Sequence, residues 1–309
     1  MSRVEGYSAL MAKVKANTWN DLDIEIEYET FGNPNDPALL LVMGFTAQLI
    51  AWDVDFCQLL ADRGRYVIRF DNRDCGLSTK LHGVEVDAAA FMNAGRSPDP
   101  KDLPTPPYTL SDFSNDAFGL LTALGIEQAH ILGASMGGMI VQTMAIEHPE
   151  RVLSLTSVMS STGELGFGGS TKEASQALLA PAKTEREEFI AQSVERGAIF
   201  SPHKHFNPDA SAQLAAAAFD RSFYPEGVVR QLTAIRGSGH RGDGLKKLAM
   251  PTLVIHGRMD PIIQLSGGDR TAELIPGAKL LVFNDMGHDT PRPLWPQIVD
   301  AVISHTQLP

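Results

Sequence analysis

Hydrophobic and polar residues alternate with a period of two in two segments near the start of the chain, residues 10–16 and 22–32. A period of two is typical of a strand with one buried face and one solvated face, so we predict two antiparallel strands here. Further along, the alternation gives way to short continuous apolar runs at 38–43, 66–70, 130–132 and 152–158. Runs of this kind are typical of parallel strands that are buried on both faces.

Segments with helical features separate these runs, at 52–64, 111–126 and 136–148. Ser111 is the candidate N-cap of the second, and the third stops just before Pro149. A later series adds strands at 251–257 and 278–283 and helices at 265–277 and 293–306. Strands that alternate with helices in this way predict an α/β protein built on a mostly parallel sheet.

The strand pattern disappears between the two series. Residues 184–200 and 209–223 there read as amphipathic helices, so we predict a helical cap inserted between two parts of one sheet. The predicted core domain comprises residues 1–160 and 247–309, and the predicted cap comprises 161–246. A second stretch, 83–109, is expected to be irregular because of its closely spaced prolines.

The charge balance limits the partners of the chain. Its 309 residues include 37 acidic and 26 basic side chains, a formal net charge of −11. This excess opposes binding to phosphate backbones and anionic lipid, so we expect neither nucleic acid nor a membrane as a partner. No apolar run reaches membrane-spanning length and the first residues lack a signal-peptide pattern, so a cytoplasmic location is expected. The oligomeric state, including a homo-oligomer, stays open.

Metal ligands are sparse along the chain. Cys57 and Cys75 are too few and too isolated for a disulfide framework or a thiolate metal site, and we expect free thiols. His203 and His205 stand close together, but no carboxylate or cysteine follows them at ligand spacing. We therefore expect no metal and no cofactor.

A serine stands between glycines directly after the apolar run at 130–132. Gly133, Ser135 and Gly137 form the pattern Gly-x-Ser-x-Gly where a strand meets a helix. A turn this tight strains its central residue and leaves no room for side chains at the flanking positions. Ser135 is thus a candidate nucleophile, and the Met136 N–H at the start of the helix is a candidate oxyanion donor.

A serine hydroxyl needs a base to remove its proton, and a histidine base needs a carboxylate to fix its tautomer. Asp260 follows the predicted strand at 251–257, and His288 follows the one at 278–283. Three residues of the required types at three strand ends, in the order Ser, Asp, His, favour a catalytic triad over unrelated turn residues.

Other titratable residues compete for these roles. Glu164 is an alternative acid from an earlier strand end, while Asp285 and Asp289 adjoin His288. His256 lies within or at the end of a buried strand, which favours a core role. A second oxyanion donor is expected from the loop after 38–43, where Gly44 allows close approach of the backbone and Phe45 offers its N–H.

Five blocks of the chain resemble the alpha/beta-hydrolase superfamily of serine hydrolases in sequence and order, at 39–45, 67–79, 133–138, 251–262 and 284–289. The resemblance extends over nearly the whole chain, and within the superfamily the likeness is to aclacinomycin methylesterase-like carboxylic ester hydrolases. The resemblance implies an alpha/beta-hydrolase fold with a mostly parallel eight-stranded sheet flanked by helices and a cap before the last two strands. It also implies Ser135 as nucleophile, Asp260 as acid and His288 as base. One departure is that Met43 stands where the superfamily commonly has a histidine before the oxyanion loop. Since the donor is main chain, the oxyanion hole is unaffected.

The function favoured by these residues is hydrolysis of a small apolar carboxylic ester through an acyl-enzyme. Aromatic residues of the predicted cap are candidate substrate contacts, although such residues also form cap cores: Phe206, Phe219, Phe223 and Tyr224. A cofactor-free perhydrolase or haloperoxidase, a C–C bond hydrolase and a lactonase are alternatives that use the same triad. A non-catalytic ligand receptor of the same fold is the alternative outside enzymes.

Overall fold

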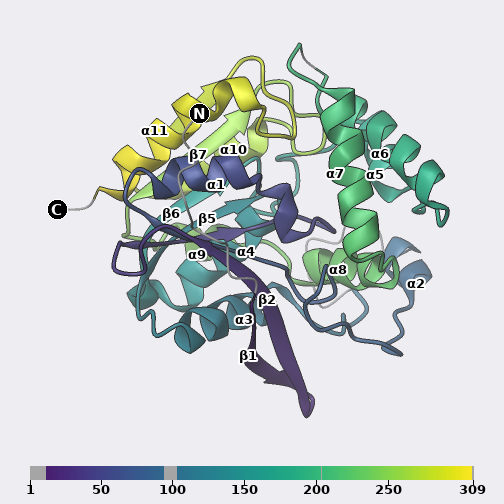
Figure 1. The fold of residues 1–309 in the computed structure, drawn as a ribbon, viewed down its shortest axis with the longest axis horizontal. Coiled ribbons are helices and arrows are strands. Elements are labelled where there is room, and N and C mark those ends of the chain that lie inside the picture. The colour runs from purple at the N-terminus through teal and green to yellow at the C-terminus, as the bar shows by residue number, and fades with distance from the viewer. Residues whose placement is uncertain (1–11, 94–102, 203, 308–309) are drawn as a thin grey trace, which may run out of the picture.

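The computed structural model describes residues 12–93, 103–202 and 204–307. At its centre is an eight-stranded sheet in the order β1-β2-β4-β3-β5-β6-β7-β8 (Figure 1). The strands are β1 (Ala12–Trp19), β2 (Leu22–Phe31), β3 (Ala38–Val42), β4 (Tyr66–Phe70), β5 (Ala129–Ala134), β6 (Val152–Val158), β7 (Thr252–Gly257) and β8 (Lys279–Phe283).

The pairing directions follow the two hydrophobic patterns of the sequence. The alternating strand β2 pairs antiparallel with both β1 and β4, whereas every pair from β4 to β8 is parallel. All residues of β3, β5 and β7 are buried, as the continuous apolar runs predict. The prediction of a mostly parallel eight-stranded sheet is therefore confirmed.

Helices cover both faces of the sheet. Those in the described residues are α1 (Val54–Ala61), α2 (Ala88–Asn93), α3 (Leu110–Ala123), α4 (Met136–Glu147), α5 (Lys172–Leu179), α6 (Arg186–Phe200), α7 (Pro208–Arg221), α8 (Glu226–Gly237), α9 (Gly242–Leu245), α10 (Ser266–Leu274) and α11 (Trp295–Thr306). Short 3₁₀ turns lie at Leu49–Ala51, Pro149–Arg151 and Arg292–Leu294.

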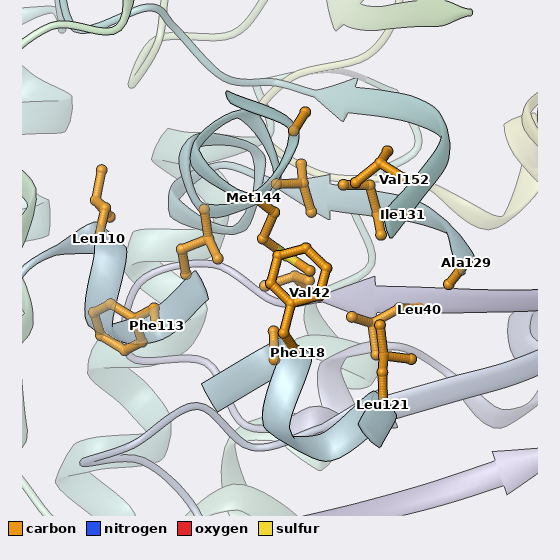
Figure 2. Close-up of a cluster of buried hydrophobic side chains, with 14 of the residues drawn as sticks. Leu40, Val42, Leu110, Phe113, Phe118, Leu121, Ala129, Ile131, Met144 and Val152 are labelled. Carbon is orange, nitrogen blue, oxygen red and sulfur yellow. The ribbon is translucent and has the colours of Figure 1, made fainter. Parts of the chain in front are cut away.

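Two hydrophobic clusters sandwich the sheet, because successive side chains of a strand point to opposite faces. Leu40 and Val42 of β3 join Ile131 in a cluster with the apolar faces of α3 and α4, which Figure 2 shows. Leu39 and Leu41 point the other way, into a second cluster with α1 and α11. The sheet is thus packed on both faces, and the loops at the carboxyl ends of its strands start from this buried layer.

The chain between β6 and β7 carries α5 to α9. Of these, α5 to α8 lie together on one side of the molecule (Figure 1). Phe189 of α6 packs against Phe219 of α7 and against Phe223, so the aromatic rings fill the space between these two helices. This segment matches the position of the predicted cap, while its limits at 161 and 246 stay a prediction.

Two local expectations are wrong. The N-cap of α3 is Thr109, whose N–H donates to the Asp112 carboxylate at 2.8 Å, and Ser111 lies inside the first turn of the helix. Residues 83–109 are not wholly irregular, because Ala88–Asn93 form α2. Positions 94–102 of that stretch lie outside the described residues.

Within the part of the chain that the structure describes, no helix combines the length and the apolarity needed to cross a bilayer.

Candidate active site

Ser135 occupies the turn between β5 and α4 in a backbone conformation that is rare for a residue with a side chain. Its φ is 57° and its ψ is −119°. The flanking glycines are required by packing: a Cβ atom on Gly133 would lie 2.1 Å from the Gly137 carbonyl oxygen, and one on Gly137 would lie 2.0 Å from the Val42 carbonyl oxygen. Strain of this kind costs of order 1–3 kcal/mol and is maintained by the surrounding structure. The turn thereby presents the Ser135 side chain at the carboxyl edge of the sheet.

The three side chains singled out from the sequence meet at this edge. His288 Nε2 lies 2.9 Å from Ser135 Oγ, and His288 Nδ1 lies 2.7 Å from Asp260 Oδ2. Both distances are those of hydrogen bonds. With Asp260 ionised, Nδ1 carries the proton and donates it to the carboxylate, so the lone pair of Nε2 faces the serine hydroxyl. This is the tautomer that a base for Ser135 requires.

Asp260 is held by a second set of hydrogen bonds. Its other oxygen, Oδ1, accepts from the backbone N–H groups of Ile262 and Ile263, both at 2.9 Å. The carboxylate is fully buried, while the His288 side chain is 11% exposed. The backbone donors therefore fix which oxygen faces the imidazole and replace the water that burial removes.

His256 lies next to this acid but has the features of a core residue. Its Nε2 donates to the Ile263 carbonyl oxygen at 2.7 Å and stands 3.7 Å from Asp260 Oδ2. Burial lowers the pKa of His256, which keeps the ring neutral. Gly268 of α10 packs against the ring, where a Cβ atom would lie 2.5 Å from Nδ1. These contacts agree with the core role expected from the sequence.

The two candidate oxyanion donors flank the serine. Met136 is the first residue of α4, so its N–H has no acceptor within the helix and lies at the positive end of the helix dipole. Gly44 runs alongside the serine, since a Cβ atom there would lie 3.0 Å from Ser135 Cβ and 3.6 Å from Ser135 Oγ. Phe45 follows directly, which puts its N–H in the loop that borders the nucleophile. The assignment of these two amides as an oxyanion hole stays a prediction.

The competing acids are engaged elsewhere. Glu164 forms an ion pair with Arg270 at 2.9 Å, and this contact lowers its pKa. Asp285 contacts His205 at 2.8 Å and Lys204 at 3.3 Å. Asp260 is the acid that the structure places against His288.

Asp289, the third competing acid, accepts a hydrogen bond from the Gly287 N–H at 3.3 Å. Among the described residues, no group of three or more His, Cys, Asp or Glu side chains is arranged to hold a metal. His203 lies outside those residues. Cys57 and Cys75 are both buried free thiols.

The aromatic candidates for substrate contact occupy three different places. Phe219 and Phe223 pack in the aromatic cluster between α6 and α7. Phe206 packs on Gly197 of α6 and lines an open pocket of about 610 Å³ together with Asp285. Tyr224 accepts a hydrogen bond from Arg230 at 2.7 Å. No ring contact or hydrogen bond in the described structure joins any of the four to the serine or the histidine, and a role in substrate binding stays a prediction.

Two contacts of the site had no signal in the sequence. Ser160, which follows β6, donates its hydroxyl proton to the Ser135 carbonyl oxygen at 2.8 Å. Gln231 of α8 accepts a hydrogen bond from the Thr46 N–H at 2.9 Å, within the loop that carries Phe45. Neither residue belongs to a motif or a periodic pattern, and only the folded chain brings them to the site.

Comparison with known proteins adds three findings. A family model for the alpha/beta hydrolase fold matches residues 37–291. Rhodomycin D methylesterase DauP of Streptomyces sp. (strain C5) is 26% identical, over 92% of this chain and 96% of that protein. The 2-hydroxymuconate semialdehyde hydrolase of Pseudomonas sp. (strain CF600) is 31% identical, over 70% of this chain and 72% of that protein.

A solved structure has the same architecture. The 2-hydroxy-6-oxo-6-phenylhexa-2,4-dienoate hydrolase (BphD) from Rhodococcus sp. strain RHA1 aligns with a TM-score of 0.74 at 19% identity, covering 97% of this chain and 99% of that one. At this level of identity the likeness concerns the fold.

Proposed function

Since the chain belongs to the alpha/beta hydrolase fold family, we propose that it hydrolyses a small carboxylic ester through an acyl-enzyme formed on Ser135. The observation that carries the proposal is the chain of hydrogen bonds from Ser135 Oγ to His288 Nε2 and from His288 Nδ1 to Asp260 Oδ2, at 2.9 and 2.7 Å. It supplies a nucleophile, a base and an orienting acid in the order needed for acyl transfer.

In the proposed acylation, Ser135 Oγ attacks the ester carbonyl carbon while His288 Nε2 takes the hydroxyl proton. The carbonyl electron pair moves to oxygen, and the Phe45 and Met136 amides stabilise the resulting oxyanion. When this pair returns, the bond to the alcohol oxygen breaks, and His288 passes its proton to the departing alkoxide. The alcohol leaves and the acyl group stays on Ser135.

A water molecule then repeats the sequence. His288 removes its proton as the water oxygen attacks the acyl carbon, and the second tetrahedral intermediate collapses to the free acid. His288 returns the proton to Ser135 Oγ, which regenerates the starting state. In this proposal Asp260 exchanges no proton: it holds the imidazole and stabilises the imidazolium that forms twice in each cycle.

The substrate class is proposed from a relative. The name of rhodomycin D methylesterase describes cleavage of a methyl ester, and that protein aligns with 92% of this chain. We take a methyl ester of a small, largely apolar acid as the substrate class to test first.

The decisive test is Ser135→Ala. Removal of the nucleophile is expected to lower kcat for p-nitrophenyl esters by at least about 10⁴-fold while the fold is retained. A fluorophosphonate probe is expected to label the unmodified protein and not this variant. Ser304→Ala, at an exposed serine of α11, is the matched control and should keep full activity and labelling. Ester turnover by Ser135→Ala at the unmodified rate would refute the proposal.

Cleavage of a C–C bond is the second candidate, because the Pseudomonas relative at 31% identity is a 2-hydroxymuconate semialdehyde hydrolase. The two candidates are separated by assaying the same preparation with 2-hydroxymuconate semialdehyde and with a series of methyl esters. We expect the higher kcat/KM for an ester. A higher value for the semialdehyde would replace ester hydrolysis as the assigned activity.

A further inference from the structure

The loop that carries Phe45 makes a tight turn whose shape is not intrinsically favourable. The Ala47 N–H donates to the Gly44 carbonyl oxygen at 3.3 Å, which closes a turn over residues 44–47. Thr46, the third residue of this turn, has a φ of 61°. A positive φ at this position is typical of a type II turn and favours glycine there, so a β-branched threonine opposes it. Contacts from outside the turn must therefore hold it in shape.

Two of these contacts come from the loop after β4. Asn72 Nδ2 donates to the Met43 carbonyl oxygen at 3.0 Å, and Cys75 Sγ lies 3.4 Å from the Thr46 carbonyl oxygen. The third comes from α8, where Gln231 Oε1 accepts from the Thr46 N–H at 2.9 Å. That N–H belongs to the central peptide of the turn. The direction of this peptide is what distinguishes a type II turn from a type I turn, in which the third residue has a negative φ.

The orientation of the Gln231 amide is fixed by its surroundings. Its side chain is buried, with 1% of the residue exposed, and its Nε2 donates to the Arg73 carbonyl oxygen at 3.0 Å. A flipped amide would set its NH₂ against the Thr46 N–H and its oxygen against a carbonyl, so neither bond would form. Gln231 thus connects the turn on one side to the loop after β4 on the other.

We propose that Gln231 is a positioning residue for the oxyanion hole: by accepting from the Thr46 N–H, it keeps the turn in the geometry that aims the adjacent Phe45 N–H at the substrate oxygen. This inference rests on the proposed function, because an oxyanion must form for the role to exist. It also means that the position of α8 against the turn and against the loop after β4 is coupled to the geometry of the oxyanion hole.

Helix α7, which precedes α8, also contacts the core domain near the turn. Gln48 Nε2 donates to the Ala218 carbonyl oxygen of α7 at 2.7 Å, and Arg221 Nη1 contacts the buried Asp71 carboxylate at 2.6 Å. Gln231 differs from these residues in one respect, because its bond is made to the turn peptide itself. A loss of Gln231 should therefore affect the transition state more than substrate binding.

The test compares Gln231→Met with Gln142→Met. Gln142 of α4 is also fully buried with both ends of its amide bonded, and its partners, Ser157 and Arg241, lie outside the turn. Loss of an oxyanion donor costs about 10²–10³ in kcat, so misplacement of one in Gln231→Met should lower kcat by about 10- to 100-fold with KM changed less than about threefold. For both variants kcat is calculated per active site, counted by titration with a fluorophosphonate. On this basis Gln142→Met should keep kcat within about threefold of the unmodified protein.

A transition-state analogue supplies the readout that a purely structural role would not change. The inhibition constant of an aryl boronic acid, which forms a tetrahedral adduct on the serine, should rise in Gln231→Met by the same factor by which kcat/KM falls. An unchanged inhibition constant would overturn the proposal, as would an equal loss of kcat in Gln142→Met.

A second substitution tests the turn directly. Thr46→Gly removes the conformational penalty at a φ of 61°, so in the double variant with Gln231→Met it should restore most of the lost kcat. Failure of this rescue would overturn the proposal, because the loss of kcat would then not come from the strained turn. If Gln231→Met does not fold, Gln231→Asn, whose shorter amide cannot reach both partners, is measured in its place with the same expectations.

Failure of this inference is distinguishable from failure of the proposed function. If the unmodified protein hydrolyses esters and Gln231→Met does so equally well, only the positioning role is lost. If the unmodified protein shows no ester turnover and Ser135 is not labelled, the proposed function itself is wrong, and the positioning role is overturned with it.

Discussion

Replacement of Asp260 by asparagine separates the catalytic role of the carboxylate from its structural one. Oδ1 accepts from the Ile262 and Ile263 N–H groups, and Oδ2 accepts from His288 Nδ1. In Asp260→Asn the amide oxygen can keep the two backbone donors, which leaves the NH₂ group facing the imidazole. Since NH₂ is only a donor, His288 must turn its Nδ1 lone pair toward it and carry its proton on Nε2. Nε2 then cannot take the proton of Ser135.

The size of the effect follows from this tautomer. A base locked in the wrong tautomer reduces kcat by about 10⁴-fold, which corresponds to about 5 kcal/mol of transition-state stabilisation. The stability of Asp260→Asn should change little, because the buried N–H groups stay paired. Asp260→Ala leaves both of them without an acceptor at about 1–3 kcal/mol each, so its free energy of unfolding should fall by about 2–6 kcal/mol.

The assay measures kcat with a p-nitrophenyl ester and the free energy of unfolding by urea titration for both variants. Asp285→Asn is the matched control, since this carboxylate is also close to His288 in sequence but contacts Lys204 and His205. We expect it to keep kcat within about threefold. If Asp260→Asn retained more than a tenth of the original kcat, the assignment of Asp260 as the orienting acid would be refuted.

Two further predictions concern stability. Ser135→Gly should be more stable than Ser135→Ala by about 1 kcal/mol in urea unfolding, because glycine adopts a φ of 57° without a clash of its Cβ, and equal stabilities would contradict backbone strain at this turn. Burial lowers the pKa of His130 to about 4 from 6.5, so its folded form stays neutral while the unfolded form gains a proton as the pH falls. The contribution of neutral His130 to the free energy of unfolding is complete above pH 6.5 and is lost as the pH falls from 6.5 to about 4. His130→Asn should therefore have a flatter dependence of unfolding midpoint on pH over this range, and an unaltered slope would show that His130 does not titrate in this way.

Much of the sheet was predictable because local sequence determines it. The alternation in β2 and the continuous apolar run of β3 each follow from which faces are buried. The meeting of Ser135, Asp260 and His288 was predictable for a related reason, since the carboxyl ends of parallel strands converge at one edge. Their catalytic roles are predictions that the Ser135 and Asp260 variants test.

Contacts between distant segments were beyond the reach of sequence patterns. The bond between Thr46 and Gln231 joins positions 185 residues apart, and neither residue type indicates it. The N-cap of α3 is a local example of what the sequence pattern could not predict. Thr109 and Ser111 are both residue types that cap helices, and the hydrogen bond from the Thr109 N–H to the Asp112 carboxylate favours Thr109. Which candidate is used depends on partner geometry, and composition does not record that geometry.

The order of the strands has a consequence for synthesis. Asp260 and His288 follow β7 and β8, which come after the other described strands in the chain and extend the sheet from β6 to its edge. A nascent chain that has passed Ser135 must grow by another 153 residues before His288 exists. Until then the proposed base is absent, and the edge of β6 is open to pairing with other chains. If the triad acts as proposed, Ser135 cannot attack an ester until the segment with β7 and β8 has joined β6, so the chain is inactive during this part of its synthesis.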